Sequence, residues 1–260
     1  MYNLPEKNQR WPGECSVCGD APTTFIDHSP GEKRWYRDYL VCERCGSVPR
    51  ERALRSALER FFPNWRKLRI HESSPSADRQ AHQKIRTECP DYSLSYFHQD
   101  IPSGSMHPIS GHRSENLEKL TFEDASFDLF LTSDVMEHVF DPIAAFREIG
   151  RVLKPGGAHV FVVPLDNGPI PSERCAELRD GQIVHLAVRP HPMLMPPPIY
   201  HGDPINADGA LQTFRWGYDI CDWIYRASGM NTVILDVQIP TIGIAGELAE
   251  AIVSFKSSAA

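Results

Sequence analysis

Two pairs of cysteines stand near the start of the chain, and a glycine follows each pair: Cys15 with Cys18, and Cys42 with Cys45. A CxxC pair on a tight turn directs two thiolates at one ion, and the glycine permits that turn. Two such pairs match a four-cysteine zinc ribbon, in which four protein ligands leave the zinc a structural role only. The alternatives are four reduced cysteines, or a disulfide pair in a small ribbon.

A second group of polar side chains stands in the middle of the chain, directly after the apolar run 127–132. It consists of Ser133, Asp134, Glu137 and His138. An apolar run of this length is typical of a buried parallel strand. Open α/β sheets bind their ligands at the carboxyl ends of such strands, so we expect these four side chains to border a ligand site.

The elements around this group follow from local signals. Asp141 and Pro142 suit the N-cap and first position of a helix, whose apolar residues recur at helical spacing until the turn Lys154-Pro-Gly-Gly157. Residues 158–164 are a second apolar run. The pattern predicts a strand–helix–strand unit, which crosses over right-handed and pairs its strands in parallel.

Composition places the whole chain among soluble globular proteins. It has 260 residues, of which 41% are apolar and 23% charged, and this suits one α/β domain with a small appendage. The net charge of −7 argues against broad binding to nucleic acid or anionic membranes. We find no apolar run long enough for a membrane span and no signal-peptide pattern, and therefore expect a cytoplasmic protein.

The middle of the chain resembles a known family. It contains FDLFLTSDVMEHV, then DP, then EIGRVLKPGG, preceded by LEKLTFEDASFDLF at residues 117–130. This order is similar to the second half of class I S-adenosylmethionine-dependent methyltransferases, in the group with an EHV…RVLKPGG signature. The HESSP turn at residues 71–75 resembles a bacterial subgroup of that family, often found with sugar or polysaccharide genes, and this likeness extends over nearly the whole chain, zinc ribbon included.

The resemblance implies a Rossmann-like α/β sheet, mostly parallel with the last strand antiparallel. We expect a zinc-ribbon-like segment at 1–49 and a methyltransferase domain at 50–260, with a substrate lid inserted at about 165–210. Within the domain we predict helices at 50–62 and 78–89, strands at 67–70 and 92–97, a helix ending at Ser228, and final strands at 232–237 and 251–255. Residues 35–41 read as a β segment of the ribbon.

The cofactor implied is S-adenosylmethionine, and the first strand should lead into its site. The family usually has a glycine-rich turn there, whereas this chain has Glu72, Ser73, Ser74 and Pro75. The serines offer small hydroxyls and backbone amides, and Glu72 either holds the cofactor's ammonium group or shapes the loop. The alternative is that cofactor binding has been lost.

Three further positions complete the expected cofactor site. Ser95 and Tyr96 occupy the end of the second strand, where relatives bind the ribose hydroxyls. Asn116 and Leu117 stand where relatives border the adenine, although Asn116 is equally suited to be a cap or turn residue. Ser133 and Asp134 should border the methyl group.

The acceptor side is expected to contain Asp134, His138 and His201. Asp134 would position an acceptor hydroxyl, and His138 would be its base, because imidazole titrates near neutrality. His201, in the lid, is the other candidate base, and a structural role for His138 is the alternative. Tyr200, Asp203 and His185 are further polar residues of the lid.

The sequence therefore predicts a methyltransferase with S-adenosylmethionine as cofactor, structural zinc, and a small molecule or sugar hydroxyl as acceptor. One alternative is a catalytically inactive methyltransferase fold that binds or scaffolds. Another is a zinc-ribbon methyltransferase acting on RNA or protein, although the acidic charge speaks against RNA. Five arginines near the cysteines are interpreted as a solvated basic face: Arg34, Arg37, Arg44, Arg50 and Arg52.

Overall fold

The computed structural model describes residues 9–19, 21–31, 34–76, 78–166, 168, 170–190, 198–203, 205–236 and 238–258. Its centre is a seven-stranded sheet in the order β15-β16-β8-β7-β4-β5-β6. The strands are β4 (Ile70–Ser73), β5 (Tyr92–Tyr96), β6 (Arg113–Ser114), β7 (Phe127–Ser133), β8 (Leu153–Val162), β15 (Asn231–Leu235) and β16 (Ala251–Phe255). All neighbours from β8 to β6 pair in parallel, while β16 runs antiparallel to both β8 and β15. The Rossmann-like sheet with an antiparallel last strand is confirmed.

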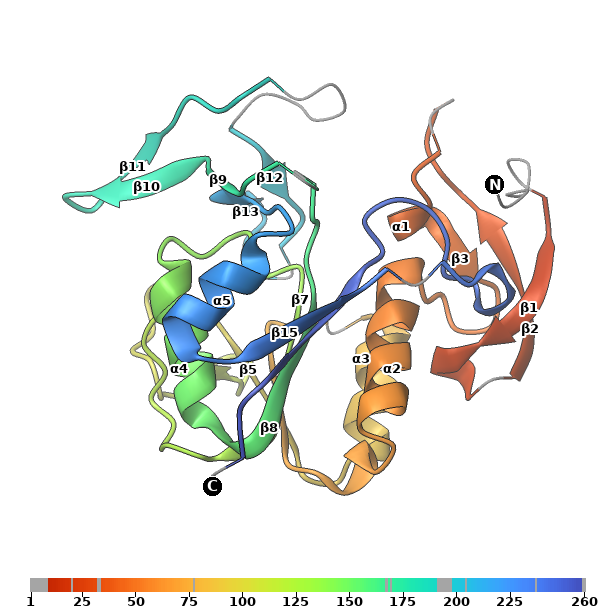
Figure 1. The fold of residues 1–260 in the computed structure, drawn as a ribbon, viewed down its shortest axis with the longest axis horizontal. Coiled ribbons are helices and arrows are strands. Elements are labelled where there is room, and N and C mark those ends of the chain that lie inside the picture. Colours follow the sequence, from red (N-terminus) through yellow and green to blue (C-terminus); the bar gives the residue numbers. More distant parts are fainter. Residues whose placement is uncertain are drawn as a thin grey trace.

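Helices cover both faces of this sheet (Figure 1). The helices α2 (Pro49–Phe61) and α3 (Gln80–Glu88) lie on one face, and α4 (Pro142–Val152) and α5 (Ile220–Ser228) lie on the other. Successive strand side chains point to opposite faces. Leu129 and Leu131 of β7 accordingly join the core under α2, and Phe130 joins the core under α4.

The strand–helix–strand unit β7–α4–β8 forms as its local signals predicted. The Asp141 carboxylate accepts a hydrogen bond from the Ala144 amide at 3.0 Å, and Pro142 opens the helix. The turn expected at residues 154–157 is part of β8, which begins at Leu153 and has an irregular register with β7 there. A Cβ added to Gly157 would lie 2.7 Å from the Asp128 carbonyl oxygen. Glycine is therefore required where β8 comes close to the start of β7.

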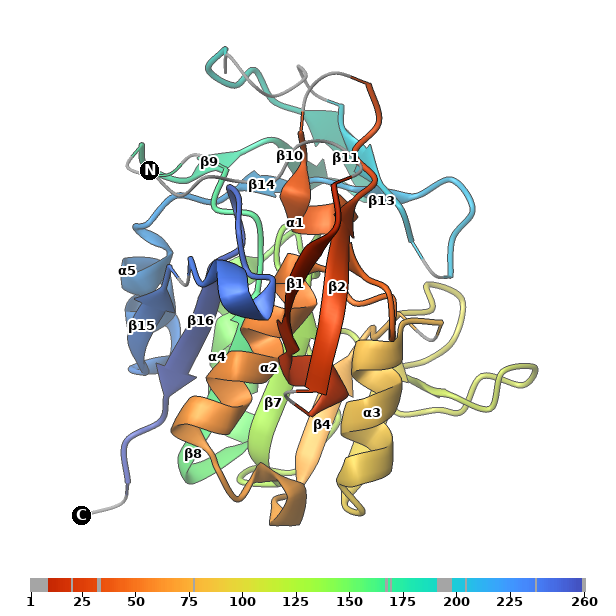
Figure 2. The same ribbon diagram turned by 90° about the vertical axis from the view of Figure 1, so that its right-hand side faces the viewer.

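The N-terminal part forms an antiparallel sheet of its own from β1 (Trp11–Cys15), β2 (Ala21–Asp27) and β3 (Leu40–Cys42). It lies beside α2, away from the central sheet (Figures 1 and 2). The β segment predicted at 35–41 is wrong in its first part, because the short helix α1 (Tyr36–Tyr39) precedes β3. A local pattern could not predict this turn, since Tyr36 and Arg37 are buried against residues far along the chain.

The first central strand begins later than predicted. A 3-10 turn, η2 (Trp65–Lys67), takes in the first residue of the expected strand 67–70, and β4 begins only at Ile70. His71, Glu72 and Ser73 are therefore strand residues, and the turn itself starts at Ser74. Polar residues are possible in a central strand here because the side chains of His71 and Glu72 find buried partners.

The inserted segment expected as a lid consists of short β pairs rather than a long loop. The described parts form β10 (Ala176–Arg179) with β11 (Gln182–His185), and β12 (Tyr200–His201) with β13 (Ala210–Leu211). A third pair joins β9 (Glu173–Arg174) to β14 (Phe214–Arg215). These pairs lie over the end of the sheet at which β7 finishes (Figure 1). In the described residues, none of the helices has the length and apolar character needed to cross a membrane.

Candidate functional site

A cleft of about 1190 Å³ opens between the carboxyl ends of the central strands and the inserted hairpins. Cavities that hold one small molecule usually measure roughly 300–1,000 Å³, so this cleft has room for two ligands side by side. On the sheet side, the following expected cofactor residues line it: Ser73, Ser74, Asn116, Leu117, Ser133 and Asp134. On the opposite side, it is lined by His138, from the loop between β7 and α4, and by Tyr200, His201 and Asp203 of the inserted segment. The exposed His185 is not among the lining residues.

The turn after β4 takes the backbone shape that a glycine would usually supply. Ser74 has a φ of +54°, in the left-handed region, and its amide donates to the Ser95 carbonyl at 2.8 Å. A positive φ lets the chain reverse sharply after the strand. The absence of glycine therefore has not removed the sharp turn at the start of the cleft.

Glu72 lies beneath the cleft rather than in it. Its carboxylate is fully buried and accepts hydrogen bonds from His82 of α3 and from the Tyr92 hydroxyl, the latter at 2.6 Å. Of the two roles considered for Glu72, this arrangement suits shaping the loop. Pro75 is likewise absent from the described lining, and its carbonyl accepts from the Tyr96 hydroxyl at 2.8 Å.

Ser95 and Tyr96 are also buried below the cleft floor. The Ser95 hydroxyl lies 2.9 Å from Nε2 of His71, and neither residue is among the described lining. Phe97 and Gln99, the residues just beyond the strand, line the cleft in their place. The sequence did not indicate them, because the strand was predicted to run to Phe97, whereas β5 ends at Tyr96 and Phe97 already lies past its end.

Asn116 serves both of the roles considered for it. Its side-chain oxygen accepts a hydrogen bond from the Glu118 amide at 2.9 Å, as a turn residue would, and the residue lines the cleft next to Leu117. The local turn thus holds the Asn116 side chain at the cleft wall.

Asp134 is held by two arginines from the N-terminal part of the chain. Arg37 pairs with both of its oxygens, and Nε of Arg50 lies 2.8 Å from Oδ2. Burial alone would oppose ionisation of this carboxyl, but the two guanidinium groups outweigh it and lower its pKa to about 2. Asp134 is therefore a carboxylate that anchors the ribbon to the cleft.

The interpretation of the arginines as a solvated face is wrong for two of them. Arg37 is 4% exposed and Arg52 is 0% exposed. Arg52 donates to the carbonyls of Leu40 and Gly243, at 2.7 Å and 2.7 Å, and so joins β3 and α2 to the turn η3 (Pro240–Ile242). These partners are distant in sequence, so no local charge pattern indicates them.

The acceptor side brings Glu137, His138 and His201 together. Oε1 of Glu137 lies 3.8 Å from Nε2 of His138 and 3.8 Å from Nδ1 of His201. The two imidazole rings meet edge to face with centroids 5.1 Å apart. The two histidines considered as candidate bases therefore share one site, although they stand in different elements.

The hydrogen bond of His138 fixes which ring nitrogen is free. Its Nδ1 lies 2.9 Å from the Leu211 carbonyl oxygen, which only accepts, so Nδ1 carries the proton and Nε2 has the lone pair. Burial lowers the pKa of His138, which favours the neutral ring. The structural and basic roles considered for His138 are thus compatible.

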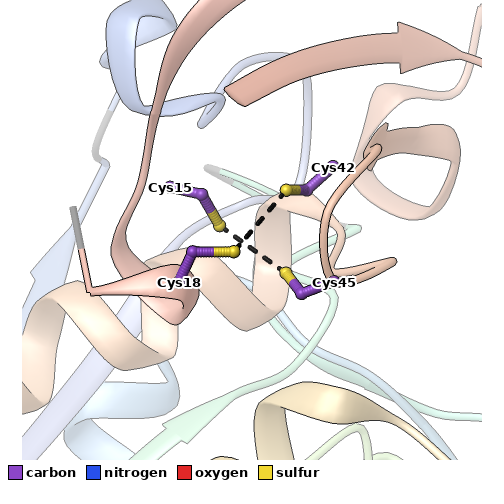
Figure 3. Close-up of side chains that lie close together, drawn as sticks. All are labelled: Cys15, Cys18, Cys42 and Cys45. Atoms are coloured by element: carbon purple, nitrogen blue, oxygen red, sulfur yellow. Dashed lines mark hydrogen bonds between the residues drawn. The ribbon is translucent and has the colours of Figure 1, made fainter. Parts of the chain in front are cut away.

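The four N-terminal cysteines converge on one point (Figure 3). The sulfur of Cys15 lies 3.8 Å from that of Cys45, and the sulfur of Cys18 lies 3.9 Å from that of Cys42. Zinc–sulfur bonds of about 2.3 Å at tetrahedral angles place sulfurs about 3.8 Å apart, so the cluster fits zinc. All seven cysteines of the chain are free thiols.

Comparison with known proteins fits this geometry. Residues 74–161 match the family model described as a methyltransferase domain, and this match runs from the turn after β4 into β8. The chain therefore has the Rossmann-like α/β fold of class I methyltransferases, with a methyltransferase-domain match over its central part. The chain is also similar, over short segments, to curated proteins. It is 47% identical over 45 residues to an uncharacterized methyltransferase of Schizosaccharomyces pombe, a stretch that covers 17% of this chain and 16% of that protein.

A second similar protein is the ubiquinone biosynthesis O-methyltransferase of Caulobacter vibrioides, with 44% identity over 57 residues, or 22% of each chain. The chain thus spans less than a quarter of the length of these curated relatives. Among solved structures, an S-adenosylmethionine-dependent methyltransferase from Mesorhizobium loti has a TM-score of 0.45 at 19% identity, covering 78% of this chain and 98% of that one. Because that score is low, the fold assignment rests on the strand order and the family match.

Proposed function

We propose that the protein transfers a methyl group from S-adenosylmethionine to a hydroxyl of a small molecule or sugar. The observation that carries this proposal is the single cleft, which joins the expected cofactor residues to a site with two histidines. Its volume accommodates both reactants at once. Methyl transfer depends mainly on such side-by-side alignment.

The residues on the sheet side suit the cofactor. Ser73, Ser74 and Ser133 offer hydroxyls, and the Asn116 amide offers both a donor and an acceptor for adenine. The left-handed Ser74 supplies the close turn that a bound nucleoside needs. When bound, S-adenosylmethionine supplies an electrophilic methyl group on a positively charged sulfur.

The residues on the opposite side of the cleft suit an acceptor hydroxyl. In this proposal the free Nε2 of His138 accepts the hydroxyl proton, because its other nitrogen is already held by Leu211. His201 lies beside it and bounds the acceptor from β12. Asp134, being fixed by Arg37 and Arg50, keeps the N-terminal part against the acceptor site rather than taking a proton.

The acceptor atom in this proposal is oxygen. The similarity to the ubiquinone biosynthesis O-methyltransferase favours an oxygen acceptor, although it covers only 22% of the chain. A carbohydrate acceptor belongs to the same proposal, on the basis of the subgroup resemblance described above.

Structural zinc bound by the four cysteines is a further part of the proposal. The hydroxyls of Thr23 and Ser47 lie 3.2 Å from the sulfurs of Cys42 and Cys45 respectively, as supporting hydrogen bonds around a metal site do. A cytoplasmic location fits this assignment, because thiols stay reduced there.

The deciding experiment is calorimetric titration of S-adenosylhomocysteine, the expected product, into zinc-replete protein and into the Ser74→Trp variant. We expect micromolar binding to the wild type and its loss in the variant, whose indole would enter the cleft. His185→Trp, on the exposed hairpin outside the cleft, is the matched control and should bind like the wild type.

Absence of binding to the wild type would favour the inactive scaffold instead. Affinity for RNA that falls steeply with salt would favour a nucleic acid acceptor. The ion pairing of Arg37 and Arg50 with acidic residues argues against the second result.

A further inference from the structure

Glu137 is a buried acid at the edge of the cleft. The residue is 0% exposed, and among the described residues neither of its carboxylate oxygens receives a hydrogen bond. Burying an unpaired carboxylate is costly, so buried charges are normally paired or bound to metal. The nearby arginines do not resolve this, because Arg37 and Arg50 pair with Asp134.

Two imidazoles approach the same carboxylate oxygen. Nε2 of His138 and Nδ1 of His201 each lie 3.8 Å from Oε1 of Glu137, and the three ligand atoms lie within 4.8 Å of one another. Both distances are too long for hydrogen bonds. Two metal bonds of about 2.1 Å at a tetrahedral angle would separate their ligand atoms by about 3.4 Å. Small side-chain rotations would therefore complete a metal site.

Hydrogen bonds from neighbouring residues fix the orientation of these three residues, as is usual around metal ligands. The Leu211 carbonyl accepts from Nδ1 of His138, which leaves Nε2 free and fixes the ring. The Thr213 amide and hydroxyl both donate to the Glu137 carbonyl, at 2.7 and 3.0 Å. His201 stands on β12, paired with the strand that contains Leu211. One hairpin thus both contributes a ligand and orients another.

We propose that Glu137, His138 and His201 form a second metal site, which binds a divalent transition ion such as Zn²⁺, Co²⁺ or Fe²⁺. Two imidazoles and one carboxylate are a ligand set that such ions prefer, and Mg²⁺ or Ca²⁺ would favour more oxygen ligands. Three protein ligands leave open coordination positions, as in catalytic rather than structural sites. Since all three residues line the cleft, the open side faces it.

An oxygen of the methyl acceptor occupies the open coordination position of the ion. This part of the proposal rests on the proposed function. An ion that binds a hydroxyl lowers its pKa. The acceptor O–H bond then breaks and its proton passes to water. The oxygen next forms the bond to the methyl group while the methyl–sulfur bond breaks, which leaves S-adenosylhomocysteine. When the ion is bound, Nε2 of His138 is a metal ligand and cannot take the acceptor's proton. His138 and His201 then position the acceptor through the ion.

Cobalt tests the metal site without cofactor or acceptor. Co²⁺ is titrated into full-length protein whose cysteine site already contains zinc, and visible absorption is recorded. We expect one additional equivalent of Co²⁺, with weak d–d bands and without the intense thiolate charge-transfer band that the cysteine site would give.

Two ligand variants and one control show where the second equivalent of Co²⁺ binds. Glu137→Gln keeps the side-chain shape, and His201→Ala removes a ligand from a half-buried hairpin position. Each should weaken Co²⁺ binding by more than roughly 100-fold, because changes to supporting residues alone cost 10–100-fold. His185→Ala, an exposed histidine on the hairpin β10–β11, is the control and should bind as the wild type does.

Three results would overturn the site. They are no second equivalent in the wild type, a charge-transfer spectrum for it, or equal binding by Glu137→Gln and the wild type. Each is independent of S-adenosylhomocysteine binding, so failure of the metal site and failure of the proposed function are distinguishable.

Discussion

Ser74 stands where its backbone conformation is unfavourable for an ordinary side chain. A left-handed residue costs roughly 1–2 kcal/mol when it carries a Cβ, and more for a β-branched side chain. We expect Ser74→Gly to fold with a stability within about 1 kcal/mol of the wild type, since relief of strain and the added freedom of the unfolded chain offset each other. It should still bind S-adenosylhomocysteine.

Ser74→Val should be less stable than Ser74→Gly by roughly 2 kcal/mol on the same grounds. Urea unfolding of the three proteins provides the comparison. Equal stability of the valine and glycine variants would show that residue 74 does not hold a positive φ in solution.

Asp134 neutralises a buried arginine, so its removal should be costly. Asp134→Asn leaves the buried Arg37 with only the Asp38 carboxylate, 3.3 Å away, and loss of one partner of a buried pair costs about 3–5 kcal/mol. The side chain of Asp134 is 22% exposed, so we expect about 3 kcal/mol, at the lower end of that range. Because the folded pKa is about 2 and the usual value 3.8, this stabilisation is present above pH 4 and is lost as pH falls toward 2.

At the residue scale, the sequence indicated groups whose signal is local. The cysteine pairs, the Asp141 cap and the polar residues after β7 all depend on neighbours within a few positions. The pairing of Arg37 with Asp134 could not be predicted, because it joins residues 97 positions apart and no local pattern connects them.

At the scale of elements, Arg37 connects the N-terminal sheet to the cleft through its contacts with Asp134 and Leu248. The helix α1 follows β2, and its Arg37 also donates to the Leu248 carbonyl at 2.6 Å. If zinc holds β1 and β3 together, its removal should destabilise the small N-terminal sheet and with it the position of Arg37 at the cleft.

We therefore expect Cys42→Ser to lose zinc, lower the thermal midpoint by several degrees and weaken S-adenosylhomocysteine binding. The link between ribbon and cleft predicts the third effect, which a separate ribbon would not produce. Metal analysis, thermal unfolding and calorimetry measure the three in turn. Cys221→Ser, at a half-buried cysteine on α5, is the control. Unchanged zinc content in Cys42→Ser would contradict the four-cysteine site.

Long periodic elements were predictable and short ones were not. The stripe of α4 and the apolar run of β7 lie within about one residue of their predicted positions. The pairs β9–β14 and β12–β13 contain two residues per strand, too few for any alternation to be seen. Their register is set by tertiary contacts such as those of Thr213 with the Glu137 carbonyl.

At the scale of the whole molecule, two histidines lie in one row of residues that crosses three strands of the central sheet. His71 of β4 is in register with Phe130 of β7, which is in register with His159 of β8. Both imidazoles are fully buried, and burial lowers the pKa of each from 6.5 to about 3. The folded sheet thus contains two neutral histidines that the unfolded chain would protonate below pH 6.5.

Folding stability should accordingly fall with acid. Above pH 6.5 both states bind equal numbers of protons at these sites, and below it only the unfolded state binds them until pH approaches 3. Each histidine then contributes a loss of up to about 1.4 kcal/mol per pH unit. Urea unfolding between pH 6 and 5 measures the slope, and His159→Phe, which keeps a ring, should reduce it by about half of the histidine contribution. An unchanged slope in this variant would mean that His159 is already charged.

The two walls of the cleft differ in how firmly they are built. Central strands end at the cofactor side, whereas His201 and the Leu211 carbonyl that orients His138 belong to a hairpin of two-residue strands. We therefore expect the cofactor residues at the strand ends to be in place before the hairpin brings His201 and the Leu211 carbonyl into position. We expect the cofactor to bind first and the acceptor second, so that the residence time of the methylated product under the hairpin limits turnover.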